Sequence, residues 1–222
     1  MEKRRLRIVA EARKLLASGG NTALNLRDLA DQAEVTVPTI YNLIGKKEDV
    51  LLAVADEVLT EIESHMTPVS STEPLNAATA IVDASIELFG EDQDFYRAAF
   101  LAVEGLDESG QHHHEVERIY AWAEALVAEG LAACLEAKLL RGRVPVELMS
   151  QLMTRTYRMN CRGWAFGHYD IDTFHRQAIG DLYLILAADA VETFHTRLMR
   201  NTSTNNTEVS VPNLEPKIKR SN

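Results

Sequence analysis

Hydrogen-bonding and cationic side chains gather in a short stretch near the start of the chain, residues 34–51, which reads EVTVPTIYNLIGKKEDVL. Thr36 and Tyr41 carry hydroxyl groups, and Lys46 and Lys47 carry ammonium groups. A helix predicted to begin near Glu48 adds free backbone N–H groups at its N-terminus, where anions bind readily. Together these groups suit the phosphates of a nucleic-acid backbone.

The first turn of a helix predicted inside this stretch carries side chains that could read bases. Val37, Pro38 and Thr39 could contact thymine methyl groups. Asn42 could pair with the edge of an adenine, and Arg27, in the preceding helix, is also a predicted DNA contact. In an isolated stretch the lysines would more often only solvate a turn, so the surrounding elements decide between the two interpretations.

A second group of residues shares one face of a helix predicted over residues 146–166 and the turn after it. Adaptable methionines lie there beside aromatic groups with polar atoms, a mixture that suits a pocket as well as plain core packing. The face consists of Met149, Met153, Tyr157, Asn160, Cys161, Trp164 and His168. Because few ionisable groups fall on it, we expect a small, mostly apolar or aromatic ligand, opposed by Phe100 and Tyr120 from neighbouring helices.

Metal and catalytic signals are weak. The run QHHHE at 111–115 holds three adjacent histidines that point in different directions, with no second ligand cluster. Glu192 and His195 have the spacing of half a di-iron site, but the chain has no second such pair. No P-loop, G-x-G-x-x-G, G-x-S-x-G or H-E-x-x-H motif occurs. The sequence therefore predicts no metal, no cofactor and no catalytic residue.

Three short helices must position the first group of residues. Gly19-Gly20 ends the first helix, Asn25 caps the second, and Thr36 caps the third, whose first turn tolerates Pro38. The expected ranges are 3–17, 26–33 and about 37–43, followed by a fourth helix from 48 to the break at Thr67-Pro68. This layout, with a tight turn between the second and third helices, is typical of a helix-turn-helix that places its last helix in a major groove of DNA.

Apolar periodicity predicts helices in the rest of the chain as well. After the linker TPVSSTEP, they are expected at 75–89, 95–103, 114–140, 146–166 and 173–200. No alternation of apolar and polar residues and no internal repeat competes with this pattern. The expected fold is all-α: an N-terminal three-helix head, then a larger helical domain.

Residues 5–55 resemble the DNA-binding segment of the TetR family of transcriptional regulators. The run LRDLADQAEVTVPTIYNLIGKKEDVLLAV has the order and spacing of that family's pattern. The matching positions are Leu29, Ala30, Ala33, Val35, Thr39, Tyr41, Gly45, Lys47 and Glu48, and the chain departs from the pattern at Val37, Pro38 and the run Asn42-Leu43-Ile44. The resemblance implies a repressor of transcription with a ligand cavity in its helical domain and a dimer formed by its last two helices.

Charge divides the chain in the same way. Its 222 residues hold 23 Lys and Arg against 33 Asp and Glu, a net charge of −10. Residues 1–50 contain nine basic and seven acidic side chains, so the acidity belongs to the remainder. This asymmetry indicates a small anion-facing head on an acidic body. No apolar stretch is long enough for a signal core or a membrane span, and the two cysteines suit buried thiols, so a soluble cytoplasmic protein is expected.

The predicted organisation is a DNA-binding domain over residues 1–46, a ligand-binding and dimerisation domain over 47–200, and a flexible tail over 201–222. The apolar run LYLILAADAV in the last helix, and Gly163 and Gly167 before it, favour a homodimer through the last two helices. The expected partners are double-stranded operator DNA and a small-molecule effector. The alternatives are an all-α enzyme, or an interaction module, with an accessory helix-turn-helix.

Overall fold

The computed structural model describes residues 1–66, 73–110 and 112–206. This part of the chain is α-helical, with no strand, as the sequence predicted. Its helices are α1 (Glu2–Ala23), α2 (Leu26–Gln32), α3 (Val37–Leu43), α4 (Lys47–His65), α5 (Pro74–Glu91), α6 (Gln93–Ser109), α7 (His113–Glu136), α8 (Val146–Ala165), α9 (Ile171–Ala187) and α10 (Glu192–Asn206).

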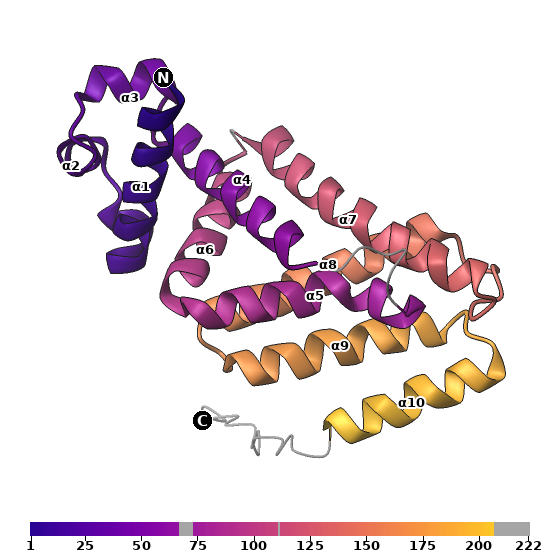
Figure 1. Cartoon of the computed structure of the whole chain (residues 1–222). Helices are drawn as coiled ribbons and strands as arrows, with labels where there is room; N and C mark the ends of the chain where they lie inside the picture. The colour runs from indigo at the N-terminus through magenta and orange to yellow at the C-terminus, as the bar shows by residue number, and fades with distance from the viewer. Residues whose placement is uncertain (67–72, 111, 207–222) are drawn as a thin grey trace, which may run out of the picture.

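The head consists of α1, α2 and α3, at the left of Figure 1, and both predicted caps are present. The side-chain oxygen of Asn25 accepts hydrogen bonds from the backbone N–H groups of Arg27 and Asp28 at the start of α2. The hydroxyl of Thr36 accepts one from the N–H of Thr39 at the start of α3. These bonds satisfy N–H groups that a helix cannot satisfy itself, which is why the two short helices begin at these residues.

The first helix is interrupted at Gly19 and Gly20, as the sequence predicted. Gly20 has a φ of 64°, in a region that a residue without Cβ occupies at little cost, and Gly19 also leaves helical geometry. The helix α1 therefore consists of a long first segment and a short turn before α2. Its buried side chains, Ile8, Val9, Ala12, Leu15 and Leu16, begin a core that continues into the body.

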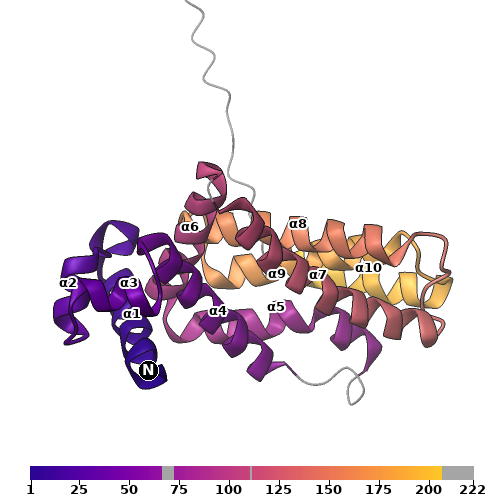
Figure 2. The ribbon, with the colours of Figure 1, turned by 90° about the horizontal axis from the view of Figure 1, so that it is seen from above.

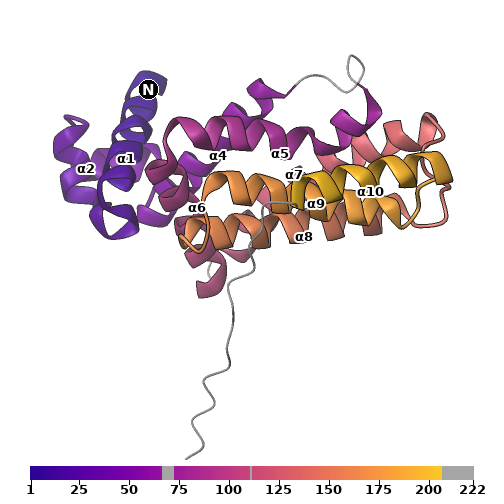
Figure 3. The ribbon, with the colours of Figure 1, turned by 90° about the horizontal axis from the view of Figure 1, so that it is seen from below.

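The body consists of α4 to α10 and extends the molecule away from the head, as Figures 1 and 2 show. Helix α4 leads out of the head and packs on α1, α5 and α6. Helices α5 and α7 pack closely, because Gly130 of α7 lies against the backbone of Ala77 and Ala78. Helices α8, α9 and α10 run side by side along the opposite side of the body, which Figure 3 shows from below.

The prediction of a single helix over 173–200 is wrong, because the chain forms two helices, α9 and α10, with a corner at 188–191. The carboxylate of buried Asp189 accepts hydrogen bonds from the N–H groups of Gly142 and Arg143, at 2.7 and 3.0 Å. The carbonyl of Asp189 accepts another from the N–H of Arg141, at 2.8 Å. This corner therefore fastens the loop between α7 and α8, and α10 folds back along α9.

Helix α10 continues to Asn206, so the first residues of the expected tail from 201 are helical. The basic run KIKR at 217–220 and most of the TPVSSTEP linker lie outside the described residues. Among the described helices, none is both long and apolar enough to cross a membrane.

Candidate DNA-binding surface and ligand cavity

Helix α3 is held by its caps and by one anchor, Ile40, which is fully buried under the head. The turn before it is tight: Glu34 has a φ of 50°, and the N–H of Val35 donates to the carbonyl of Ala30 at 2.9 Å. Arg7 of α1 fixes this turn, since its guanidinium donates to the carboxylate of Glu34 at 3.0 Å and to its carbonyl at 3.3 Å. The caps, the buried Ile40 and the contacts of Arg7 with Glu34 thereby hold α3 in a fixed position with its outer side accessible.

The residues predicted to contact DNA lie on the outer side of this head. Tyr41 is 51% exposed. The exposed members are Arg27, Thr36, Pro38, Tyr41, Asn42 and Lys46, and Val37, Thr39 and Lys47 are half-buried. Most of the predicted set therefore lies on α3 and at its two ends, Arg27 lies on α2, and six of the nine residues are exposed.

Lys47 also makes a hydrogen bond that stabilises the head. Its ammonium group donates to the carbonyl of Asn21 at 2.6 Å and so ties the start of α4 to the connection between α1 and α2. Gly45 makes the turn from α3 to α4 with a φ of 137°, and a Cβ there would meet the carboxylate of Asp49. That carboxylate accepts the N–H of Lys46 at 2.7 Å and caps α4.

The basic start of α1 was not among the predicted contacts. Lys3, Arg4 and Arg7 line a shallow hollow there with Met1, and the pair between Arg7 and Glu34 places this end of α1 beside the turn that precedes α3. The run KRRLR at 3–7 is the signal that could have identified it.

An apolar cavity of about 110 Å³ lies between α4, α5, α6, α7 and α8 of the body. Its walls are aliphatic and aromatic, and its polar groups are few. The lining residues that carry the argument below are Ile62, Tyr96, Phe100, Tyr120, Trp122, Thr154, Tyr157, Arg158 and Cys161.

Four of the predicted ligand contacts, Phe100, Tyr120, Tyr157 and Cys161, line this cavity. The other three, Met149, Met153 and Trp164, lie outside it: all are almost fully buried, and only Met153 reaches a neighbouring void of about 10 Å³. The ring of Trp164 is stacked between those of Phe89 and Phe174, at centroid distances of 5.2 and 5.7 Å. The face of α8 is thus divided between cavity and core.

Several cavity residues were not predicted. Tyr96 and Trp122 point in from α6 and α7, and α4 contributes Val58, Leu59 and Ile62. The sequence does show an apolar stripe on α4, but a stripe says only that a face is covered and not what covers it.

A second, larger cavity of about 450 Å³ adjoins the first and is lined mainly by charged side chains. Tyr120, Thr154 and Arg158 line both cavities and form the boundary between them. The remaining walls of this outer cavity are Asp107, His113, Glu117, Ala121, Glu124 and Arg155.

Glu104, which is 4% exposed, organises the boundary. Its carboxylate accepts hydrogen bonds from the hydroxyl of Tyr120 at 2.6 Å, from Nε of Arg158 at 2.7 Å and from the guanidinium of Arg162 at 3.0 Å. A buried carboxylate needs such partners, because an unpaired one would be strongly disfavoured. Burial and the bond to Glu104 raise the pKa of Tyr120 well above its usual range, so its hydroxyl keeps the proton it donates.

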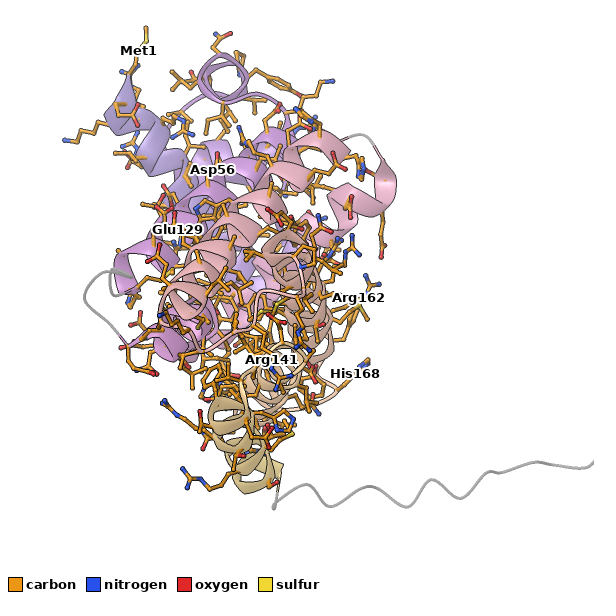
Figure 4. The ribbon with its side chains drawn as sticks, turned by 90° about the vertical axis from the view of Figure 1, so that its right-hand side faces the viewer. Met1, Asp56, Glu129, Arg141, Arg162 and His168 are labelled. Atoms are coloured by element: carbon orange, nitrogen blue, oxygen red, sulfur yellow. The ribbon has the colours of Figure 1, made fainter. Side chains whose placement is uncertain are left out.

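Asp107 continues this network toward the outer cavity. It accepts a hydrogen bond from Arg158 at 2.6 Å and lies 2.8 Å from Nδ1 of His113. The bonds from Arg158 and then His113 hold the pKa of Asp107 below its usual value. In Figure 4 the neighbouring Arg162 lies at the outer edge of the body, so the network reaches solvent. Over the described residues, no group of three or more His, Cys, Asp or Glu side chains could hold a metal ion.

A polar cluster joins the apolar cavity to the head. The hydroxyl of Tyr96, whose ring lines the cavity, donates to the carboxylate of Glu61 at 2.9 Å. The same carboxylate pairs with Arg13 of α1, whose guanidinium lies 4.2 Å from the ring centroid of Phe95. Burial and then Glu61 raise the pKa of Tyr96 to about 12, so the hydroxyl stays protonated at neutral pH.

Comparison with known proteins finds a family match over the head and the start of α4. Residues 8–54 match the family model described as bacterial regulatory proteins, tetR family. No curated protein matches the chain.

Solved structures resemble most of the fold. A putative TetR-family transcriptional regulator from Rhodococcus sp. has a TM-score of 0.69 at 14% identity, over 83% of this chain and 99% of that one. FadR from Bacillus subtilis, in complex with stearoyl-CoA, has a TM-score of 0.66 at 17% identity, over 82% and 97%. FadR from Thermus thermophilus, a TetR-family repressor in complex with lauroyl-CoA, has a TM-score of 0.64 at 20% identity, over 85% and 96%.

Proposed function

We propose that this chain, as a member of the TetR family of bacterial transcriptional regulators, is a repressor of transcription. It leaves its operator when a small, mostly apolar molecule binds in the cavity of the body. The head binds double-stranded DNA through α3. The inner cavity receives the effector, and a change in the spacing of two heads releases the DNA.

The chemistry of the head supports DNA as the partner. Accessible hydroxyl, amide and ammonium groups gather on and beside α3 and can meet both phosphates and base edges. The acidic body would be repelled by DNA, so only the head can approach it closely.

The inner cavity supports an apolar effector. Its lining is almost entirely carbon, so a charged group on a ligand buried there would have no free partner. Two of the similar structures hold lauroyl-CoA and stearoyl-CoA, which indicates that a body of this fold can accommodate a long apolar chain.

The observation that carries the proposal is the contact between cavity and head. Tyr96 lines the cavity with its ring and binds Glu61 with its hydroxyl, and Glu61 pairs with Arg13 of α1. A ligand that moves the ring of Tyr96 therefore acts directly on the position of the DNA-binding head. Such a ligand shifts the balance only if it binds the DNA-incompetent arrangement more tightly.

A homodimer completes the proposal, because one recognition helix reads few bases and paired heads must lie about 34–36 Å apart to meet successive major grooves. Its interface is the solvent side of α8, with α9 beside it. Large apolar side chains recur there on one stripe, namely Leu148, Leu152, Met159 and Phe166, and Leu184 of α9 is exposed as well. Gly163 and Gly167, which were expected to favour the dimer, do not support this interface. Gly163 lies against the ring of Tyr169 of its own chain, and Gly167 falls beyond the end of α8.

A gel-shift titration tests the function, using DNA from upstream of the chain's own gene and 1-octanol as an apolar probe. We expect 1-octanol to weaken DNA binding by the wild type. Tyr96→Phe should keep probe-free binding and need more 1-octanol for release, whereas Tyr183→Phe, a control on α9 outside the cavity lining, should behave as the wild type. A chain that binds no DNA fragment would favour the enzyme or interaction-module alternative instead.

A further inference from the structure

The hydroxyl of Thr154 is the unusual group at the boundary of the two cavities. Thr154 is 3% exposed, and its Oγ1 has no hydrogen-bond partner among the described residues. Buried hydroxyls are nearly always paired, so an unpaired one on a residue that lines a cavity is available to a ligand that can supply the bond. Thr154 lines the inner and the outer cavity alike.

The other polar groups at the boundary are already engaged. The hydroxyl of Tyr120 donates to Glu104, and Arg158 donates to Glu104 and Asp107. A carboxylate on the ligand would have to compete with Glu104 and Asp107 for Arg158. An uncharged acceptor has no such competition, because it needs only the hydrogen that Thr154 can donate.

The outer cavity carries both signs of charge. Asp107, Glu117 and Glu124 are acidic, while Arg155 and Arg158 are basic. A polyanionic group placed there would lie among three carboxylates. An uncharged group rich in hydroxyls could instead donate to the carboxylate of Glu124 and accept from the guanidinium group of Arg155.

We infer that the effector is an uncharged acyl ester or amide, whose chain fills the inner cavity, whose carbonyl accepts a hydrogen bond from Thr154, and whose hydroxyl-bearing head occupies the outer cavity. The inference rests on the proposed effector-binding function and narrows its ligand class. It separates this chain from the structurally similar proteins that hold acyl-CoA, since the head of the ligand here carries no net charge.

A pair of probes that differ only in the carbonyl tests this assignment. Glyceryl 1-octanoate has the chain, the carbonyl and a diol head, and 1-O-octylglycerol has the same chain and head with an ether in place of the ester. Calorimetry with the wild type should show about tenfold tighter binding of the ester, as expected for one hydrogen bond made in a buried site. Octanoyl-CoA, with the same acyl chain and an anionic head, should bind more weakly than the glyceryl ester.

Thr154→Val keeps the shape of the side chain and removes the hydroxyl. It should abolish the preference for the ester, leave the affinity for the ether unchanged, and leave the melting temperature unchanged or raised, because no bond within the protein is lost. Thr156→Val is the matched control, since that hydroxyl donates to the carbonyl of Leu152 on the exposed side of the same helix and its loss should not alter the ester preference.

The inference would be overturned by equal affinity of the wild type for ester and ether, by an ester preference that survives in Thr154→Val, or by tighter binding of octanoyl-CoA than of the glyceryl ester. Absence of binding by both glyceryl probes would also overturn it. Binding of the ester with no effect on the gel shift would count against the proposed repressor and leave the ligand assignment standing, so the two failures are distinguishable.

Discussion

Single substitutions in the head should distinguish the two kinds of DNA contact that we propose for it. Lys46 is exposed beside the start of α4, where it can meet a phosphate, and Asn42 is exposed on α3, where it can meet a base. Lys46→Ala should weaken binding to all sequences alike and reduce the salt dependence by about one unit. Asn42→Ala should instead change the preference at one base position. Gel shifts at several salt concentrations distinguish these effects.

Lys14→Ala is the control for this experiment, since it removes the same charge from an exposed residue of α1 that pairs with Glu11. Lys47→Ala would be a poorer choice, because the ammonium group of Lys47 also donates to the carbonyl of Asn21 and its loss would disturb the head itself. If Lys46→Ala and Asn42→Ala both keep wild-type affinity and preference, the DNA-binding surface has been placed incorrectly.

The two thiols give a prediction about chemical reactivity. Burial raises the pKa of Cys134 and of Cys161 to about 12, so both remain protonated at pH 8, and the thiolate that reacts with alkylating reagents is scarce. Iodoacetamide at pH 8 should modify neither cysteine in the native protein and both in urea, as mass spectrometry would show. Rapid native labelling of Cys161 would mean that the inner cavity opens to reagent.

The sequence could not show which residues on the inward face of α8 line the cavity and which pack in the core. Tyr157 and Cys161 line the cavity while Met149 and Trp164, on the same face, pack against other helices. The periodicity specifies that a residue points inward, but the partner across from it depends on how distant helices pack. Tyr96 was missed for the same reason, because its role follows from contacts with α4 and α1.

At the scale of helices, the packing of α5 on α7 depends on Gly130. A Cβ at this position would lie 2.5 Å from the carbonyl oxygen of Ala77, so the two helices would have to separate. Gly130→Ala should lower the free energy of unfolding by about 1–3 kcal/mol. Gly105→Ala on α6 is the control: a Cβ there meets nothing within 4 Å, and the substitution should stabilise by up to about 1 kcal/mol. Urea unfolding measures both, and equal effects would contradict the prediction.

Helix boundaries were predictable where the determinant is local. Asn25 and Thr36 cap α2 and α3 with bonds to residues two or three positions away, and the sequence places both caps correctly. The corner between α9 and α10 was missed because its determinant is distant. Asp189 is satisfied by N–H groups of Gly142 and Arg143, some 46 residues earlier, and no local pattern predicts that bond.

At the scale of the whole molecule, charge sets how the protein approaches DNA. The head carries a small positive charge while the rest of the chain is strongly acidic. The head is at one end of the elongated molecule and the corner of α9 and α10 at the other, as Figure 2 shows, so the acidic body extends away from a DNA bound at the head. Orientation therefore comes from long-range repulsion as well as from contact.

Assembly provides the last prediction. The exposed apolar side chains of α8 recur on one stripe instead of being scattered singly, and covering the stripe with a second copy would place two heads on one operator. Met159→Glu, in the centre of the stripe at a residue 64% exposed, should produce a folded monomer, because the side chain contributes little to the core of its own chain. The monomer should bind operator about 100-fold or more weakly, since the two half-sites are no longer bound by linked heads.

Light scattering at micromolar concentration reports the assembly, and a gel shift reports the affinity. Leu135→Glu introduces the same charge at an exposed leucine of α7, outside the stripe, and should remain dimeric with normal DNA binding. A wild-type monomer that binds operator specifically would refute the dimer. If Met159→Glu stays dimeric and Leu135→Glu does not, a dimer forms through a different face, and the spacing of the heads must be set by α7 in place of α8.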